Sequence, residues 1–414
     1  MELILQLLVV ILLAYVLAEI CKFIRIPRVV GQITAGLILS VPYIQSWVFT
    51  GQSFEILSFL ADIGAILLFF FVGLEINILK FKENAAESAK ISLLNTSIPF
   101  ILGFVISIAL GLNTIKATIV GVALSVSAQS ISIDFLEEMK MMKSRLGQLI
   151  ITAGAVDDII ELLLVSAVLA MIQTTIGNSN LLTLIGSILL FIVILVISKL
   201  YILPNVLTFF ERGKDKTTLF TGALVITLLM AALSEKFGLG SLIGALLAGV
   251  LVRQILLAKG ARMDEESITS TIHIISFGFL VPIFFVWIGL NTNLAGILDN
   301  LWFTLALTII AFGGTIYGTM MGVLWSKGTA QEGYILGWGL NPKGDVELVI
   351  ASLALQKQII DVSLFSSLIF VALATTIVSP VVFRYLIGEY RKRNSTNAIE
   401  DIAATHAKKL KRHA

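Results

Sequence analysis

Apolar positions fill most of the chain in long stretches that short polar loops separate. Most stretches approach the ~20 residues that cross a bilayer as a helix. We distinguish thirteen, at residues 2–21, 29–44, 57–74, 91–112, 115–136, 146–172, 181–203, 217–235, 239–257, 268–290, 301–325, 331–355 and 362–387. Because a backbone inside lipid must satisfy its own hydrogen bonds, these stretches predict helices. The pattern therefore predicts an all-α polytopic membrane protein with about 13 transmembrane helices.

Composition narrows the function classes in the same direction. Hydrophobic residues make up 57% of the chain and charged residues 14%, where a soluble domain carries about 25%. The balance excludes a soluble enzyme and a disordered protein. A net charge of +2 gives no electrostatic basis for binding nucleic acid, and the single cysteine cannot form an internal disulfide. No cofactor is indicated.

Basic residues orient the predicted spans. Of the 29 Lys and Arg residues, seventeen lie at loops that follow odd-numbered spans, three at loops after even-numbered spans, and eight after the last span. By the positive-inside rule the odd loops and the C-terminus face the cytoplasm, and the N-terminus lies outside. We expect an integral protein of the plasma membrane.

The sequence contains an internal repeat with an offset of about 214 residues. "VVGQITAGLIL" at 29–39 matches "LIGALLAGVLV" at 242–252, and "LFFFVGLEIN" matches "IFFVWIGLNTN" in the same order. Small residues that favour helix packing explain part of the match, but two ordered blocks favour duplication. The offset is seven spans, so the second copy is inverted, as in secondary transporters.

The repeat divides the chain into four parts. We expect a first inverted repeat at 1–175 and a connecting span at 176–215. A second repeat at 216–387 and a short basic cytoplasmic tail at 388–414 complete the chain.

Two spans concentrate ionisable residues where charge is costly. In "GAVDDIIELLLVSAV", Asp157 and Asp158 are adjacent, and Glu161 follows one turn later on the same broad helix face. In "GWGLNPKGDVELVIA", helix-breaking and charged residues alternate: Asn341, Pro342, Lys343, Gly344, Asp345 and Glu347. We predict a helix break there.

The first repeat offers a counterpart of this break at "LSVSAQSIS", which contains Ser127 and Gln129. Each repeat thus predicts one discontinuous helix, whose freed carbonyls and helix ends can bind a cation. The alternative is structural, an ion pair such as Asp157 with Lys343. Adjacent carboxylates in a low-dielectric site cannot both ionise cheaply, so a cation and protons can compete for them.

The paired aspartates of "GAVDDII" and the motif "NPKGDVELVIA" resemble those of monovalent cation:proton antiporters of the second branch. That family includes bacterial sodium/proton exchangers and potassium efflux systems, and the resemblance covers nearly the whole chain. It implies a mobile core of spans 4–6 and 11–13, with spans 5 and 12 crossing as broken helices. Spans 1–3 and 8–10 would form the scaffold of a homodimer.

The resemblance also implies residue roles. Asp158 matches the main cation and proton carboxylate, Asp157 its neighbour, and Ser127 a position that often holds Thr. Lys343 and Asp345 match an Arg and a Glu of the family motif. We treat Glu161, Gln129, Lys343, Asp345, Glu347 and Tyr317 as site or supporting residues.

One departure concerns the Lys that electrogenic members carry in span 11. Tyr317 stands at the aligned position, so Asp157 needs another partner, such as Lys343 or a proton shared with Glu161. The hypothesis is electroneutral exchange, which strong stimulation by an imposed membrane potential would contradict.

The sequence thus predicts an antiporter that exchanges a monovalent cation for protons by alternating access. Na⁺ is the favoured candidate for this cation, and Li⁺ and K⁺ are the alternatives. Three alternatives remain: a Na⁺-coupled symporter, a channel, and an intramembrane aspartyl protease built on Gly344-Asp345. The paired aspartates, the inverted repeat and the absence of a selectivity-filter sequence favour the antiporter.

Overall fold

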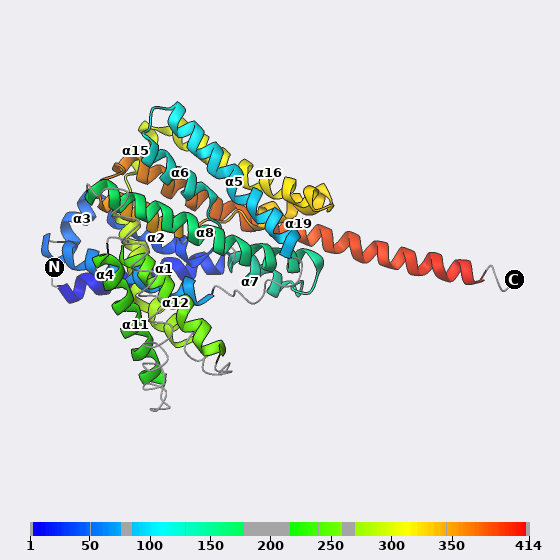
Figure 1. Ribbon diagram of the computed structural model, residues 1–414, viewed down its shortest axis with the longest axis horizontal. Helices are drawn as coiled ribbons and strands as arrows, with labels where there is room; N and C mark the ends of the chain where they lie inside the picture. The colour runs from blue at the N-terminus through cyan, green and yellow to red at the C-terminus, as the bar shows by residue number, and fades with distance from the viewer. Residues whose placement is uncertain are drawn as a thin grey trace.

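The structure is a computed structural model of the chain, and it describes residues 3–49, 51–75, 85–128, 130–177, 216–237, 240–258, 270–344 and 346–410. Within these ranges the regular structure is helical (Figure 1). Helices occupy every predicted span except the seventh, at 181–203, which lies outside the described residues. The prediction of an all-α polytopic membrane protein is confirmed.

The described residues up to 177 form eight helices: α1 (Leu3–Phe23), α2 (Arg28–Leu39), α3 (Pro42–Val48), α4 (Gly51–Glu75), α5 (Ala85–Ala109), α6 (Thr114–Ser125), α7 (Ser130–Glu138) and α8 (Arg145–Gly177). The second half contains α11 (Lys216–Lys236), α12 (Ser241–Ala258), a π-helical turn η3 (Ser276–Leu280), α14 (Val281–Leu290), α15 (Leu294–Asp299), α16 (Leu301–Trp325), α17 (Ala330–Gly339), α18 (Val346–Gln356) and α19 (Val362–Leu410). Among the described residues, six helices are long and apolar enough to span a bilayer on their own.

Proline explains two departures from the predicted spans. The span expected at 29–44 is bent by 88° between α2 and α3, because Pro42 cannot continue the helix that ends at Leu39. If α2 and α3 are counted as one bent span, the described residues contain seven candidate spans instead of six. In the span expected at 268–290, a π-helical turn immediately precedes Pro282, whose missing N–H disturbs the regular ladder.

Glycines let two pairs of helices cross with their backbones in contact. A Cβ atom on Gly36 of α2 would lie 2.1 Å from the Val286 carbonyl oxygen of α14, facing Gly289. A Cβ on Gly249 of α12 would lie 2.1 Å from the Phe70 carbonyl oxygen of α4, facing Gly73. The sequence repeat matches α2 with α12 and α4 with α14, so matched helices make matched crossings.

A second group of helices packs around α5 and α16, which lie side by side (Figure 1). Gly314, Gly318 and Gly322 of α16 face the α5 backbone at Pro99, Leu94 and Ile91. Helix α6 packs on α5, and α17 packs on α16. Helix α8 then packs against α5, α6 and α17.

Two broken helices cross at the centre of this group. Helix α6 ends at Ser125, the chain runs extended at Val126, and α7 begins at Ser130. Helix α17 ends at Gly339, and α18 begins at Val346. The Ala128 N–H donates to the Pro342 carbonyl at 2.6 Å, and the Ser132 hydroxyl donates to the Gly339 carbonyl. The breaks predicted from "LSVSAQSIS" and "NPKGD" are therefore where the sequence places them.

Helix α19 extends beyond its predicted span. It continues as a helix to Leu410 and projects from the bundle toward the C-terminus (Figure 1). Most of the residues expected as a short basic tail therefore belong to this helix.

Candidate ion-binding site

Asp157 lies fully buried near the middle of α8, and α5 supplies its hydrogen bonds. Ser92 and Thr96 donate to its Oδ1 at 2.7 Å each, and the Asn95 side-chain amide donates to its Oδ2 at 2.8 Å. Hydrogen bonds to both oxygens compensate a buried carboxylate for lost hydration. Among the contacts of the described residues there is no salt bridge between Asp157 and Lys343, and three neutral side chains of α5 donate to the carboxylate.

Asn95 connects Asp157 to a further helix and to the crossing. Its Oδ1 accepts a hydrogen bond from Thr319 of α16 at 2.9 Å, and its amide nitrogen lies 3.5 Å from the Ser127 hydroxyl oxygen. We did not predict the α5 donors as site residues. Their signal in the sequence is the group of polar residues in "SLLNTS", inside an otherwise apolar predicted span.

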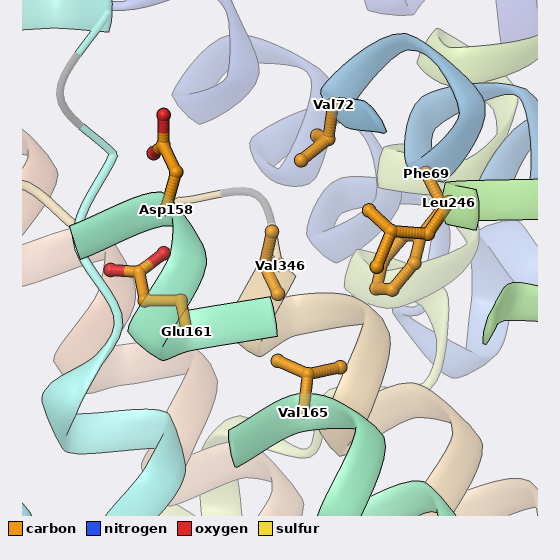
Figure 2. Close-up of a pocket in the computed structure, with 7 residues that line it drawn as sticks. All are labelled: Phe69, Val72, Asp158, Glu161, Val165, Leu246 and Val346. Atoms are coloured by element: carbon orange, nitrogen blue, oxygen red, sulfur yellow. The ribbon is translucent and has the colours of Figure 1, made fainter. Parts of the chain in front are cut away.

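Asp158 faces a small cavity between α4, α8, α12 and α18. Its side chain is partly exposed, and the cavity has a volume of about 20 Å³, room for about one water molecule. The lining residues are Phe69, Val72, Asp158, Glu161, Val165, Leu246 and Val346. Figure 2 shows the two carboxyl groups at one side of the cavity and the apolar side chains at the other. Asp158 and Glu161 are thus the two polar residues of this lining, and both are carboxylates.

Glu161 reaches from α8 to the crossing. The side chain is buried, and its Oε1 accepts a hydrogen bond from the Ser127 N–H at 2.6 Å. Asp158 and Glu161 line one cavity, whereas Asp157, which we expected on the same broad helix face, turns toward α5. The surroundings of Asp157 are thus separate from those that Asp158 and Glu161 share.

Lys343 lies fully buried between α17 and α18. Its Nζ donates to the Val126 carbonyl oxygen at 2.9 Å, and its own carbonyl accepts from the Thr376 hydroxyl of α19. The lysine therefore supports the crossing directly, by bonding a carbonyl that the break in the first repeat leaves without a helical partner.

The other residues predicted for the site have different surroundings. Asn341 donates to the Phe312 carbonyl at 3.1 Å, and Glu347 is buried in the first turn of α18. Gln129 and Asp345 lie outside the described residues. Tyr317 is 52% exposed on α16; Thr319, two residues further along the helix, is the α16 residue that reaches Asn95.

Asp62 is a charged residue within a predicted span that the sequence analysis overlooked. It lies on α4, and its two carboxylate oxygens accept from the Gln356 amide of α18 at 3.2 and 3.3 Å. This contact joins α4 to the far end of the helix whose first residue, Val346, lines the cavity.

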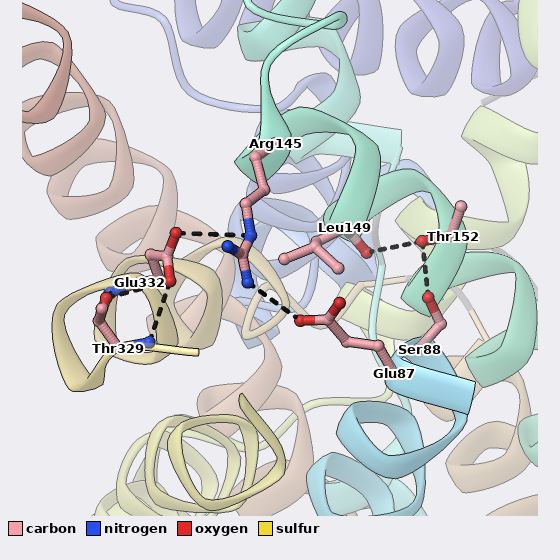
Figure 3. Close-up of polar contacts among 7 residues, drawn as sticks. All are labelled: Glu87, Ser88, Arg145, Leu149, Thr152, Thr329 and Glu332. Carbon is pink, nitrogen blue, oxygen red and sulfur yellow. Dashed lines mark hydrogen bonds and ion pairs between the residues drawn. The ribbon is translucent and has the colours of Figure 1, made fainter. Parts of the chain in front are cut away.

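A separate polar group ties together the ends of three helices (Figure 3). Arg145, at the start of α8, lies 3.4 Å from Glu87 of α5 and 3.6 Å from Glu332 of α17. Glu332 also forms a capping box with Thr329, which satisfies N–H groups at the start of α17. Ser88 donates to Thr152 at 2.6 Å. These contacts hold α5, α8 and α17 in register at the end remote from α15.

The site offers oxygen ligands to a cation. Within the described ranges, no group of three or more His, Cys, Asp or Glu side chains is placed to hold a metal ion. A cation in the cavity would take one or two carboxylates and neutral oxygens, a set of hard ligands. Polar groups at crossed, broken helices near the middle of a membrane fold define a secondary ion transporter.

Comparison with known proteins gives the family. The chain matches the family described as "Sodium/hydrogen exchanger, transmembrane" over residues 8–387, and it belongs to that family. It is 26% identical over 362 residues to the Na⁺/H⁺-K⁺ antiporter GerN of Bacillus cereus, covering 87% of this chain and 90% of that protein. It is 28% identical over 371 residues to a Na⁺/H⁺ antiporter of Enterococcus hirae, covering 89% and 94%.

A solved structure supports the fold independently. The sodium/proton antiporter MjNhaP1 of Methanocaldococcus jannaschii superposes with a TM-score of 0.68 at 18% identity, over 94% of this chain and 98% of that one. The predicted membership of the monovalent cation:proton antiporters is confirmed. The relatives are transporters rather than enzymes, and their shared activity is cation/proton exchange.

Proposed function

We propose that this protein exchanges Na⁺ for protons by alternating access, with Asp158 as the carboxylate that binds them in turn. The observation that carries the proposal is the position of Asp158, partly exposed in a cavity beside the crossing of the two broken helices. Asp157 and Ser127 complete the site in this proposal, as a hydrogen-bonded neighbour and as a hydroxyl ligand close to the crossing. GerN is named as a Na⁺/H⁺-K⁺ antiporter and the Enterococcus hirae protein as a Na⁺/H⁺ antiporter; Na⁺ is common to both names, which supports Na⁺ as the cation.

The moving part in this proposal is the group α5–α8 with α16–α19. The scaffold would be α1–α4 with α11–α14, joined by its glycine crossings, and residues 176–215 would connect the repeats. The cavity supports this division because α8 and α18 line one side and α4 and α12 the other. A homodimer formed through the scaffold, in the plasma membrane with the C-terminus inside, completes the proposal.

The size of the cavity favours a cation over an organic substrate. A volume of about 20 Å³ admits one water molecule or a small ion, whereas pockets for organic ligands are about 300–1,000 Å³. This supports the antiporter over a Na⁺-coupled symporter.

The test is transport by purified protein in sealed proteoliposomes that contain a pH-sensitive dye. Addition of NaCl, LiCl or KCl outside should move protons outward through the wild type. Asp158→Asn, which keeps the size of the side chain, should abolish the signal while the protein still inserts and elutes as the wild type does. Wild-type exchange by this variant would overturn the assignment of Asp158, and no cation-dependent proton movement by the wild type would overturn the activity.

A further inference from the structure

A single peptide unit at the break in the first repeat is held by two side chains of opposite charge. The Val126 carbonyl accepts from the Lys343 ammonium at 2.9 Å, and the Ser127 N–H donates to Glu161 Oε1 at 2.6 Å. The two charged groups come from different elements, the α17–α18 break and the middle of α8. We refer to Lys343, the Val126–Ser127 peptide and Glu161 as the peptide clamp.

The charges of the peptide clamp match the dipole of the peptide they hold. A positive group at the carbonyl oxygen and a negative group at the N–H are the favourable arrangement, and both are stronger than neutral hydrogen bonds. A buried peptide outside a helix needs hydrogen-bond partners for its N–H and its carbonyl. Any neutral acceptor could satisfy the Ser127 N–H, however, so the need for an acceptor alone does not explain a carboxylate.

The cavity supplies the reason for a carboxylate. Glu161 lines the same cavity as Asp158, and only its Oε1 accepts the Ser127 amide. A carboxylate has two oxygens with about four acceptor positions, so one side chain can hold the amide and a cation together. A carboxamide could hold the amide through its single oxygen, but it would bring no charge to the cavity.

We infer that Glu161 is a specificity-determining residue: it joins Asp158 in binding the cation while it holds the Ser127 amide of the crossing. This inference rests on the proposed function. Two anionic oxygens give a stronger field than one, and a stronger field favours the smaller, more strongly hydrated cation. Glu161 therefore favours Na⁺ over K⁺, and cation binding acts directly on the peptide at the break.

The test compares Glu161→Gln with a matched control. Glu235→Gln is the control because Glu235 also accepts a backbone N–H, from Ser241 at 2.7 Å, but its side chain is exposed and does not line the cavity. The cation concentration for half-maximal thermal stabilisation of purified protein measures binding without transport. For Glu161→Gln we expect this concentration to rise about tenfold for Na⁺ and about twofold for K⁺. The control should match the wild type.

Further variants separate a cation ligand from a purely structural residue. If Glu161→Gln binds Na⁺ and K⁺ as the wild type does, and only Glu161→Ala is impaired, the residue serves the crossing alone and the inference is overturned. If Glu161→Gln does not fold, Glu161→Asp, whose carboxylate is one methylene shorter, should still lower the Na⁺ preference over K⁺; an unchanged preference would overturn the inference.

Asp158→Asn distinguishes this failure from failure of the proposed function. If Asp158→Asn loses cation stabilisation and Glu161→Gln does not, the site stands and the inference falls. If neither variant changes exchange or cation stabilisation, both the proposed function of Asp158 and the inference about Glu161 are overturned.

Discussion

The protein contains two kinds of helix crossing: one is formed by glycines in backbone contact, and the other by hydrogen bonds between broken helices. Where α2 meets α14 and α4 meets α12, glycines face each other and the backbones touch. Where the α6–α7 break meets the α17–α18 break, the chain leaves its helices and hydrogen bonds connect the two segments. The first kind is tightly packed through backbone contact; the second is polar and is held by the charged side chain of Lys343.

The difference teaches how a duplicated fold divides its tasks. Close backbone contact through glycine is intolerant of displacement, because an added Cβ or a shifted helix would overlap a main-chain atom. Hydrogen bonds across a break are directional but can be exchanged for others, including bonds to an ion or water. The glycine crossings suit a rigid frame, and the polar crossing suits a binding site.

The largest effect should follow from removing the charge that supports the polar crossing. Lys343→Ala leaves the buried Val126 carbonyl without its donor and creates a cavity, so we expect a loss of about 2–5 kcal/mol in stability. Thermal unfolding in detergent would measure it, with the exposed Lys143→Ala as control. Wild-type stability combined with lost exchange would instead make Lys343 part of the transport chemistry.

An intermediate effect should follow from disturbing a glycine crossing. In Gly73→Ala the new Cβ would lie 2.1 Å from the Leu246 carbonyl oxygen, so the helices must separate, at a cost of about 1–3 kcal/mol. The control is Gly51→Ala in the same helix, where nothing lies within 4 Å of the added atom. Equal unfolding temperatures for the two variants would contradict the view of these crossings as a rigid frame.

The smallest effect concerns a polar contact outside the crossing. Asp361 precedes α19, and the Leu364 N–H, which donates to its Oδ1 at 2.9 Å, lowers the pKa of the carboxyl; Lys116 at 3.5 Å adds to this. A lowered pKa means that the contribution is present above the ordinary Asp value of about 3.9 and is lost as the pH falls through the folded value. Asp361→Ala should therefore destabilise by about 1 kcal/mol at pH 7 and by less below pH 4.

A second variant assigns this pH dependence to its cause. Lys116→Ala should keep most of it, because the backbone amide makes the larger contribution. A pH dependence that disappears in Lys116→Ala would show that the exposed ion pair matters more than the helix cap.

The sequence predicted the spans and both breaks because these depend on local properties. Apolar length sets the spans, and Pro342 with Gly344 sets the second break. The bend before α3 was also readable, since Pro42 lies inside the predicted span. Side-chain partners are a different problem, because they depend on how distant helices are rotated against each other.

Asp157 illustrates this limit. Its adjacency to Asp158 marked it as important, but its donors lie more than 60 residues away on α5. The alignment placed Tyr317 near it, whereas Thr319 is the α16 residue that connects to Asn95. Two residues along a helix turn a side chain by about 200°, so a small register error moves a residue from the interior to the exposed face.

The three donors to Asp157 have a mechanical consequence. Ser92, Asn95 and Thr96 are spaced by three and four residues along one face of α5, and all three bond the same carboxylate of α8. Sliding α8 along α5 by even one residue, about 1.5 Å, would strain all three bonds together. Together with the Arg145–Glu87 and Ser88–Thr152 contacts, these bonds tie the two helices to each other, so we expect a displacement of α8 to carry α5 with it.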